Sequence, residues 1–225
     1  MSHLSSIQRP FSSRNLDIEL LTAIRRDDET DIRRLLTLGA NPLANIKYSP
    51  SATFLACKLG VSPGILEALI EAGADVTALA SPILNETHLH LAAESGRAGL
   101  VRILIEAGVD PYVEARNGSL TALAMASNGS VVHALVECGV DINHRNSEGH
   151  VALAHMDNLH AVIAAIELGA DTALRTIRNG RVVGGGHYLG RNDACNEAIT
   201  IAQRRKALVA KVVRSEETEQ SRRAI

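Results

Sequence analysis

The side chains most capable of chemistry are the two histidines of the segment THLHLAAESG, residues 87–96. His88 and His90 stand two positions apart, as zinc ligands sometimes do, but such a site needs a third and a fourth ligand in fixed geometry. We therefore expect no metal site, and the role of the pair depends on the elements that hold it. The later histidines follow no ligand spacing: His133, His144, His150, His155, His160 and His187.

A second candidate is the glycine-rich segment GRVVGGGHYLGR, residues 180–191. Backbone N–H groups of such a loop can cradle a phosphate. The segment, however, has neither the lysine and hydroxyl residue of a P-loop nor the spacing of a dinucleotide fingerprint. We favour a long hairpin in which RVV and HYL pair across the glycines. The exposed His187, Tyr188 and Arg191 would then suit contact with a partner.

Catalytic signatures are otherwise scarce. Serine, histidine and aspartate are all present, but no nucleophile elbow of the form G-x-S-x-G occurs. Cys57, Cys138 and Cys195 fall in expected helices as small apolar residues, and their spacing forms neither a disulfide framework nor a zinc pattern. We predict that the protein is not an enzyme and uses no cofactor.

Composition favours packed helices. The chain has 225 residues, of which 46% are hydrophobic and only 2% aromatic, a balance typical of helices rather than sheets. No apolar run approaches the roughly 20 residues that span a bilayer, and the N-terminal segment contains no signal-peptide core. With three widely spaced cysteines, we expect a cytoplasmic protein with no membrane association.

One phrase recurs five times along the chain: LLTLGANP, LIEAGADV, LIEAGVDP, LVECGVDI and AIELGADT. Each copy closes an apolar-periodic helix, so its glycine is expected to take the left-handed conformation just after the helix. Asn or Asp follows two positions later in every copy and favours a turn into a loop. The glycines are spaced 34, 35, 31 and 30 residues apart, at Gly39, Gly73, Gly108, Gly139 and Gly169.

The segment before each phrase repeats more loosely, as SATFLACKLG (51–60), THLHLAAESG (87–96), TALAMAS (121–127) and VALAHM (151–156). Small residues at Ala56, Ala92 and Ala126 would let two helices approach closely, and Thr87 or Thr121 can cap the helix that follows. Each unit is therefore expected to be a helix, a tight turn, a helix and an exposed loop. One such unit cannot bury its apolar face alone, so neighbouring units must stack.

These residues resemble the ankyrin repeat, whose period is about 33 residues and whose signature is T-P-L-H-x-A. The resemblance covers residues 17–213 and is strongest in THLHLAAESG followed by LVRILIEAGVD. It implies an all-α ankyrin-repeat solenoid of helix-turn-helix units joined by β-hairpin-like loops, with about five to six repeats including caps. His90 falls on the signature histidine, which resembles a structural hydrogen-bonding residue, and His88 replaces the proline. The fourth and fifth units lack about three residues near SNGS and HMDN, which predicts a shortened first helix or turn in each.

The predicted organisation is one repeat domain over residues 16–213, with units that end near the five glycines and capping helices over 193–213. Residues 1–15 are serine-rich and expected to be flexible, as is the polar tail 214–225. The glycine-rich insert spans 179–192 and separates the fifth unit from the capping helices.

The resemblance implies a non-catalytic scaffold that binds one protein partner through the concave face and the loop tips of the solenoid. Specificity would then reside in residues that the fold does not dictate, with tyrosines as anchors inside a polar rim. The predicted partner-binding residues are Lys47, Tyr48, Glu94, Ser95, Tyr112, Glu114, Arg116, Asn117, Asn128, His144, Arg145, Asn146, His187, Tyr188 and Arg191.

Charge is distributed unevenly. Residues 59–171 contain fourteen acidic and four basic side chains, a net charge of −10, against +8 in the two flanks. An acidic centre can steer a basic partner, as an inhibitor or immunity protein that covers a toxin or enzyme would need. Equally, eight of the acids recur at two repeat positions and need no partner to explain them.

Other functions stay open at this point. Basic segments such as RRKALVAK lack the interleaved aromatics that stack on bases, so we expect no nucleic acid. One alternative is a secreted effector that docks on a host protein. Another is an enzyme or ligand-binding protein that uses the glycine-rich insert near His187.

Overall fold

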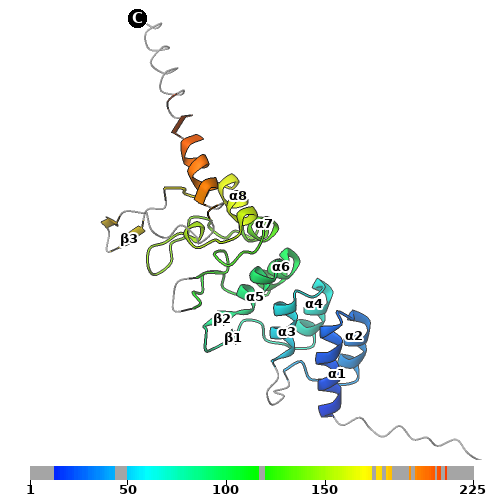
Figure 1. The fold of residues 1–225 in the computed structure, drawn as a ribbon. Coiled ribbons are helices and arrows are strands. Elements are labelled where there is room, and N and C mark those ends of the chain that lie inside the picture. The colour runs from blue at the N-terminus through cyan, green and yellow to red at the C-terminus, as the bar shows by residue number, and fades with distance from the viewer. Residues whose placement is uncertain are drawn as a thin grey trace, which may run out of the picture. The chain divides into compact units, whose positions relative to one another are not determined.

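The computed structural model describes residues 13–43, 50–116, 120–173, 176–178, 181–183, 193, 196–205, 207–208 and 211. The chain forms two compact units, Met1–Val113 and Glu114–Ile225, and each is described by itself. Helices predominate in the described parts of both units, and the strands are short (Figure 1). The predicted all-α repeat fold is confirmed.

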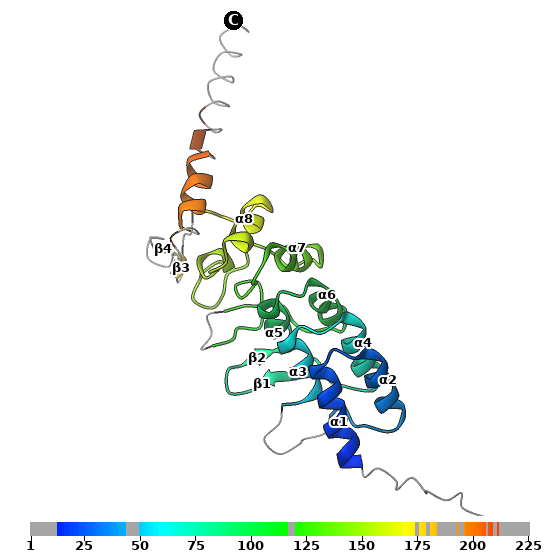
Figure 2. The same ribbon diagram turned by 45° about the vertical axis from the view of Figure 1, so that its right-hand side comes forward.

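The first unit contains three helical hairpins that form two layers. Helices α1, α3 and α5 pack side by side in one layer, and α2, α4 and α6 do so in the other, as Figure 2 shows. Stacking like this is what the repeat pattern predicts, because each hairpin buries its apolar face against the next. The bounds are α1 (Ser13–Arg25), α2 (Glu29–Thr37), α3 (Ala52–Leu59), α4 (Pro63–Glu71), α5 (His88–Ser95) and α6 (Ala98–Glu106).

Side-chain caps mark where several of these helices begin. Oδ1 of Asp28 accepts a hydrogen bond from the N–H of Asp31 at 3.0 Å before α2, and Oγ of Ser51 accepts one from the N–H of Phe54 at 3.1 Å before α3. Pro63 stands in the first turn of α4, where its missing N–H costs no intrahelical bond. The ends of the helices are therefore determined locally.

The core of the first unit lies between its two layers. Ala56 and Ala92 are completely buried, as expected of small residues where adjacent first helices approach closely. Helices α4 and α6 also approach closely, because a Cβ on Gly99 would lie 2.7 Å from Cγ of Pro63. The large side chains in this core are at most 1% exposed: Leu20, Ile24, Ile32, Leu35, Ile65 and Leu69.

The glycines of the recurring phrase are all left-handed, with φ between 89° and 93°. An ideal Cβ would meet no atom within 4 Å at any of them, so backbone conformation rather than space requires glycine. The prediction of left-handed glycines is therefore confirmed, and so is the prediction of a turn at the Asn or Asp that follows. Two positions later, each side chain accepts a hydrogen bond at 2.8–2.9 Å from the N–H two residues further on: Asn41, Asp75, Asp110, Asp141 and Asp171.

In the second unit the first-position elements, which stand in place of the first helix of each hairpin, are shortened. Helices α7 (Gly129–Glu137) and α8 (Leu159–Glu167) pack against each other. Before α7 the chain makes only a turn over 122–125, and before α8 it makes a single 3-10 turn, η1 (Ala152–Ala154). The shortening predicted from the missing residues in the fourth and fifth units is confirmed.

Two antiparallel strand pairs occur among the described residues. Strand β1 (Leu79–Ser81) pairs with β2 (Glu86–Thr87), and β3 (Thr176–Arg178) pairs with β4 (Arg181–Val183). Segment RVV is β4 and pairs with the preceding TIR, a pairing that was not predicted from the sequence, while the expected pairing of RVV with HYL stays a prediction. The physical reason for the pairing with TIR is the intervening Asn-Gly dipeptide, which favours a two-residue hairpin turn. The HYL segment lies outside the described residues.

Residues 196–205 are helical and pack on the fifth repeat. Ile199 is 2% exposed, and Nε2 of Gln203 donates a hydrogen bond to the Thr172 carbonyl. The capping pair over 193–213 and the boundaries of the flexible ends stay predictions, because residues 1–12 and 212–225 lie outside the described residues. No helix in the described part of the chain is long and apolar enough to cross a membrane.

Candidate functional site

His88 is a buried link between two repeats. It is 3% exposed, its Nδ1 lies 3.0 Å from the Val76 carbonyl, and its Nε2 lies 3.0 Å from Oγ1 of Thr53 in α3. A carbonyl only accepts, so Nδ1–H donates to Val76 and Nε2 accepts from the threonine hydroxyl, which defines the neutral imidazole. Burial lowers the pKa of His88 and keeps the ring uncharged.

His90 caps its own helix. Its Nδ1 accepts a hydrogen bond from the Thr87 N–H at 3.1 Å and lies 2.9 Å from the Thr87 hydroxyl, so α5 begins in a reciprocal cap. The structural role predicted for His90 is confirmed. Within the residues that the structure describes, no group of three or more His, Cys, Asp or Glu is arranged to hold a metal ion.

The β1–β2 hairpin presents an apolar tip on a buried base. Glu86 and Thr87 in the base are 3% and 2% exposed, whereas Ile83 at the tip is 96% exposed. Leu84, next to Ile83 in the turn, is 44% exposed, and Leu79, which pairs with Thr87 at the base, is 40% exposed. The base is held by Thr87 at the start of α5 and by the neighbouring His88, so the tip stands on a fixed support.

Sequence reasoning did not select this tip as a binding element. The available signal was the triplet Pro-Ile-Leu at 82–84, which places two large apolar residues in a turn where polar residues and glycine dominate. An exposed isoleucine at a turn has no role in the core, and apolar surface of this kind marks interaction sites when it is contiguous.

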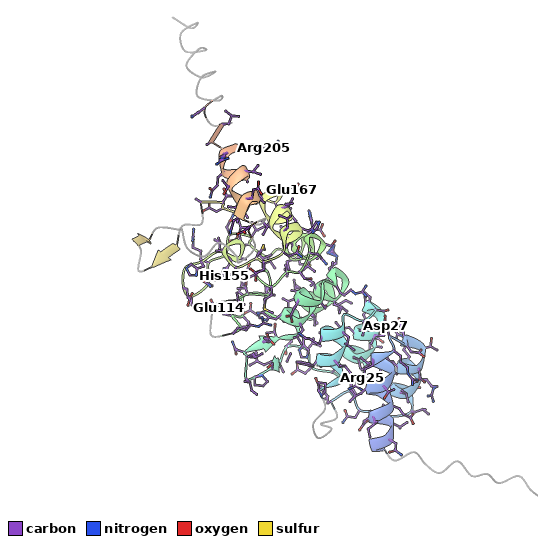
Figure 3. The ribbon with its side chains drawn as sticks, viewed as in Figure 1. Arg25, Asp27, Glu114, His155, Glu167 and Arg205 are labelled. Carbon is purple, nitrogen blue, oxygen red and sulfur yellow. The ribbon has the colours of Figure 1, made fainter. Side chains whose placement is uncertain are left out.

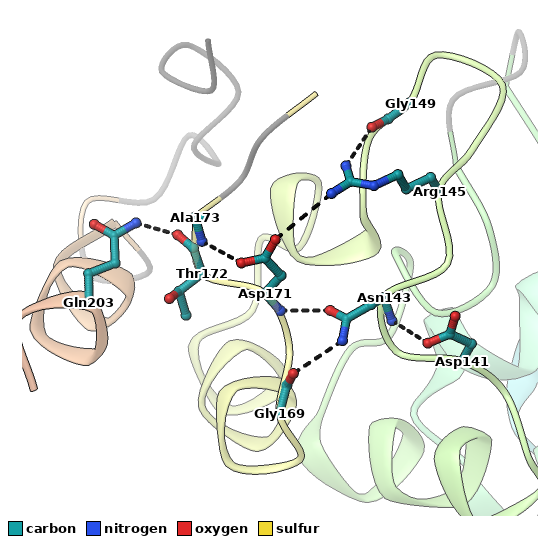
Figure 4. Close-up of polar contacts among 9 residues, drawn as sticks. All are labelled: Asp141, Asn143, Arg145, Gly149, Gly169, Asp171, Thr172, Ala173 and Gln203. Atoms are coloured by element: carbon teal, nitrogen blue, oxygen red, sulfur yellow. Dashed lines mark hydrogen bonds and ion pairs between the residues drawn. The ribbon is translucent and has the colours of Figure 1, made fainter. Parts of the chain in front are cut away.

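In the second unit, polar side chains tie successive loops together (Figure 4). Oδ1 of Asn143 accepts from the Asp171 N–H at 2.6 Å, and Nδ2 of Asn143 donates to the Gly169 carbonyl at 3.2 Å. Arg145 donates to the Gly149 carbonyl at 2.9 Å and approaches the Asp171 carboxylate at 3.8 Å. The loop after α7 is therefore joined to the loop after α8.

Glu114, labelled in Figure 3, makes the corresponding link one repeat earlier. Its carboxylate accepts from the N–H of Ser147 at 2.6 Å and from the hydroxyl of Ser147 at 2.5 Å. Single antiparallel bridges, Ala115 with Leu120 and Arg145 with Val151, close the two loops at their bases. The loop tips of this unit thus have defined positions relative to one another.

The predicted partner-binding residues of the first unit lie half-buried on its surface. Glu94 forms an ion pair with Lys58 at 2.7 Å, and the hydroxyl of Ser95 donates to the Ala92 carbonyl at 3.0 Å. Tyr112 lies in the loop after α6, half-buried, with its N–H donated to Asp110 at 2.8 Å.

Besides Glu114 and Arg145, two other predicted residues of the second unit have roles in the fold. Oδ1 of Asn128 caps α7 by accepting from the Val131 N–H at 3.0 Å. Asn146 is 8% exposed, and its Oδ1 accepts from the N–H groups of Glu148 and His150 at 3.1 and 2.8 Å. These two asparagines have structural roles that sequence reasoning did not assign.

The remaining predicted residues of the second unit are accessible loop residues. Arg116 is exposed and left-handed, with a φ of 52°, while Glu114, His144 and Arg145 are half-buried. Partner binding by any of these residues stays a prediction. Outside the described residues lie Lys47, Tyr48, Asn117, His187, Tyr188 and Arg191.

Two histidines lie side by side under these loops. The ring centroids of His150 and His155 are 5.2 Å apart, and both line a small cavity of about 10 Å³ together with Thr121 and Asn146. Burial, and then the neighbouring His150, lower the pKa of His155 (Figure 3). A neutral imidazole with one neighbouring histidine is a structural arrangement rather than a ligand set.

Known proteins share both the repeat and the fold. A family model described as ankyrin repeats (3 copies) matches residues 20–115 and 53–146. The B-cell lymphoma 3 protein homolog of Mus musculus is 29% identical over 156 residues, which make up 66% of this chain and 35% of that relative. This chain therefore spans about a third of the length of the relative it matches.

A solved structure gives the same result for the fold. It is the crystal structure of the ankyrin repeat domain of Bcl-3, described as a unique member of the IkappaB protein family. It matches with a TM-score of 0.59 and 24% sequence identity, over 80% of this chain and 81% of that chain. The likeness shows a common fold.

Proposed function

This chain belongs to the ankyrin repeat family, and from that membership we propose that it is a protein-binding scaffold without catalytic activity. It captures one protein partner through its loop tips and the exposed faces of its first-position elements. In the sites described above, histidine, asparagine and aspartate side chains cap helices, close turns and join repeats, so the fold already accounts for these polar groups.

The observation that carries the proposal is the 96% exposure of Ile83 on a hairpin whose base is buried. Full burial of an isoleucine contributes about 1.5–3 kcal/mol, and at this tip only a partner can provide that burial. The fixed base lowers the ordering cost of binding, because little conformational freedom remains to be lost. The fitting partner offers an apolar recess for Ile83, with Leu84 at its edge.

Loops of the second unit supply polar contacts of their own. The bonds from Glu114 to Ser147 and from Asn143 to Asp171 hold these loops in place. Arg116 and His144 are thereby presented on a rigid base, and polar groups of this kind set the orientation of a partner more than they add affinity.

We further propose that the partner has a basic surface and that binding covers its functional site, as an inhibitor or immunity protein does. The support is the net charge of −10 over residues 59–171, which steers a positively charged protein toward the chain. A scaffold that performs no chemistry acts on its partner by occupying it. Affinity for such a partner should fall as the salt concentration rises.

The test begins with capture from a native lysate, followed by calorimetry with the purified partner. Ile83→Asp should weaken binding roughly 10- to 150-fold, the equivalent of about 1.5–3 kcal/mol, and leave the melting temperature unchanged because the side chain is exposed. Leu38→Asp at the C-cap of α2 is the matched control, since Leu38 is 54% exposed and belongs to the other helix layer, outside the loop tips and the first-position elements. Wild-type affinity in Ile83→Asp would remove the hairpin tip from the interface.

Two further measurements complete this test. The double variant Tyr112→Ala, Arg116→Ala examines the predicted loop residues, and weaker capture without unfolding is the expected result. Calorimetry with nucleotides and with Zn²⁺ should give no saturable heat. Saturable uptake of either ligand would instead favour a ligand-binding protein that uses the glycine-rich insert.

A further inference from the structure

The second unit contains an apolar groove at its C-terminal end. The groove has a volume of about 640 Å³ and lies between α8 and the helical residues 196–205. Its charged lining residues are Glu167 on α8 and Arg205 on the C-terminal helical segment, both labelled in Figure 3. Most other lining residues are apolar: Ile163, Ile166, Ala170, Ala198, Ile201 and Ala202.

Large apolar side chains at this groove remain in contact with water. Ile163 is 40% exposed and Ile201 is 56% exposed, and Leu208, which follows along the helical segment, is 63% exposed. In the first unit the same repeat position is buried, whereas Met125 and His155 hold it half-buried in the second unit. Aligning AITIAQ (198–203) with HLHLAA (88–93) places Ile201 on Leu91, which is only 2% exposed.

The helical segment has the residue spacing of a helix-pairing seam. Ala198, Ile201, Arg205 and Leu208 follow one another at intervals of three, four and three residues, which is the a/d spacing of a coiled coil with one charged residue among three apolar ones. Ile199 packs inward on the fifth repeat, at 2% exposure, so the seam is a second apolar face of the same helix. Such a seam packs against a second helix.

We propose that the occupant of the groove is the same helical segment of a second copy, so that two chains form an antiparallel two-fold dimer. A two-fold interface must be self-complementary, and this surface is: it combines an apolar recess with the protruding Leu208. In an antiparallel pair, Ile201 of each chain meets Leu208 of the second copy.

Charge on the groove fits this arrangement as well. Arg205 lies at the centre of the seam, so the two copies of its guanidinium come near the two-fold axis, where they repel each other unless an opposite charge is close. Glu167 lines the same groove and provides the opposite charge, which allows each Arg205 to pair with Glu167 of the second copy. The surface thus carries its own counter-charges, and the proposal is independent of the hairpin tip proposed above for a different protein.

Sedimentation of the full chain tests the dimer. The wild-type mass should rise with concentration from 24.0 kDa towards twice that value. Ile201→Glu should raise the dimer dissociation constant at least about tenfold, while circular dichroism stays unchanged because the side chain is already exposed. Ile83→Glu is the matched control, because it places the same change on an exposed isoleucine outside the groove, and it should associate as the wild type does.

Charge reversal provides the second readout. Glu167→Arg and Arg205→Glu should each weaken association, and the double variant should restore it, because the pair is rebuilt across the interface with its signs exchanged. The proposal is overturned if the wild type remains at 24.0 kDa at every concentration reached, or if Ile201→Glu associates like the wild type. Failure of Ile83→Asp to affect partner binding would leave the dimer untouched, so the two proposals fail separately.

Discussion

Replacing His88 by alanine removes two hydrogen bonds from the interior of the first unit at once. The Val76 carbonyl loses its donor and the Thr53 hydroxyl loses its acceptor, both at 3.0 Å in the folded chain, and the hydroxyl keeps only the longer contact with Oγ of Ser51 at 3.3 Å. Because Thr53 belongs to α3 and His88 to α5, the change acts at the joint between two repeats. Loss of the ring also leaves space at a position that is only 3% exposed.

The magnitude follows from these contacts. A buried hydrogen bond contributes about 1 kcal/mol net, and a buried polar group left without its partner costs about 1–3 kcal/mol. For one carbonyl and one hydroxyl we expect His88→Ala to lower the free energy of unfolding by about 3–4 kcal/mol. His88→Asn should cost about half as much, because its Nδ2 can still donate to Val76 as Nδ1 does.

Urea titration followed by far-UV circular dichroism measures these differences. His88→Gln is a useful companion, since its side-chain amide reaches toward Thr53 rather than Val76. A change below about 0.5 kcal/mol for His88→Ala, the level expected of an ordinary surface substitution, would refute the conclusion that His88 joins two repeats.

The same variants test the charge state of the ring. Burial lowers the pKa of His88 in the folded chain below that of a free histidine, about 6.5. At a pH between these two pKa values, the unfolded chain binds more protons than the folded chain. The free energy of unfolding must therefore fall as the pH falls below about 6.5, and the full contribution is present above it. His88→Asn has no titratable group at this position and should show a shallower fall, while His155 contributes equally in both proteins. Equal slopes would contradict a neutral, buried His88.

Two other changes test the repeat phrase and the linked loops. Gly73→Ala should lower the free energy of unfolding by about 1–2 kcal/mol through left-handed strain alone, since no atom lies near the added Cβ; Gly73→Asn should cost less, and equal costs in thermal denaturation would argue against strain as the cause. Glu114→Ala should speed hydrogen exchange at the Ser147 amide, which loses its acceptor at 2.6 Å, and unchanged exchange would mean that Glu114 does not hold the loop.

Much of the fold could be predicted because its signals are local. Gly73 must be left-handed to end α4, and Asp75 accepts the N–H two residues further on to close the turn. The residue types alone therefore predict both features. The shortened elements at 122–125 and Ala152–Ala154 follow from the missing residues. The pairing of β4 with β3 was not predicted, although the Asn-Gly dipeptide between them favours a two-residue hairpin turn.

The candidate site could be predicted only in part. Asn146 was predicted as a partner contact in a loop and Asn128 as one on the first-helix face, yet each accepts N–H groups of its own turn or helix start. Ile83 was passed over because its type suggests a core residue. Residue type does not tell whether neighbouring elements reach a given side chain.

By itself the sequence determined the repeat, its register and the conformation of each glycine-ended turn, because these depend on contacts within a few residues along the chain. The tertiary structure alone decided which apolar and polar groups are left for other molecules. Leu91 and Ile201 occupy the same repeat position, but Leu91 is 2% exposed and Ile201 is 56% exposed. Exposure is a property of what packs against a residue, and that depends on segments distant in the sequence.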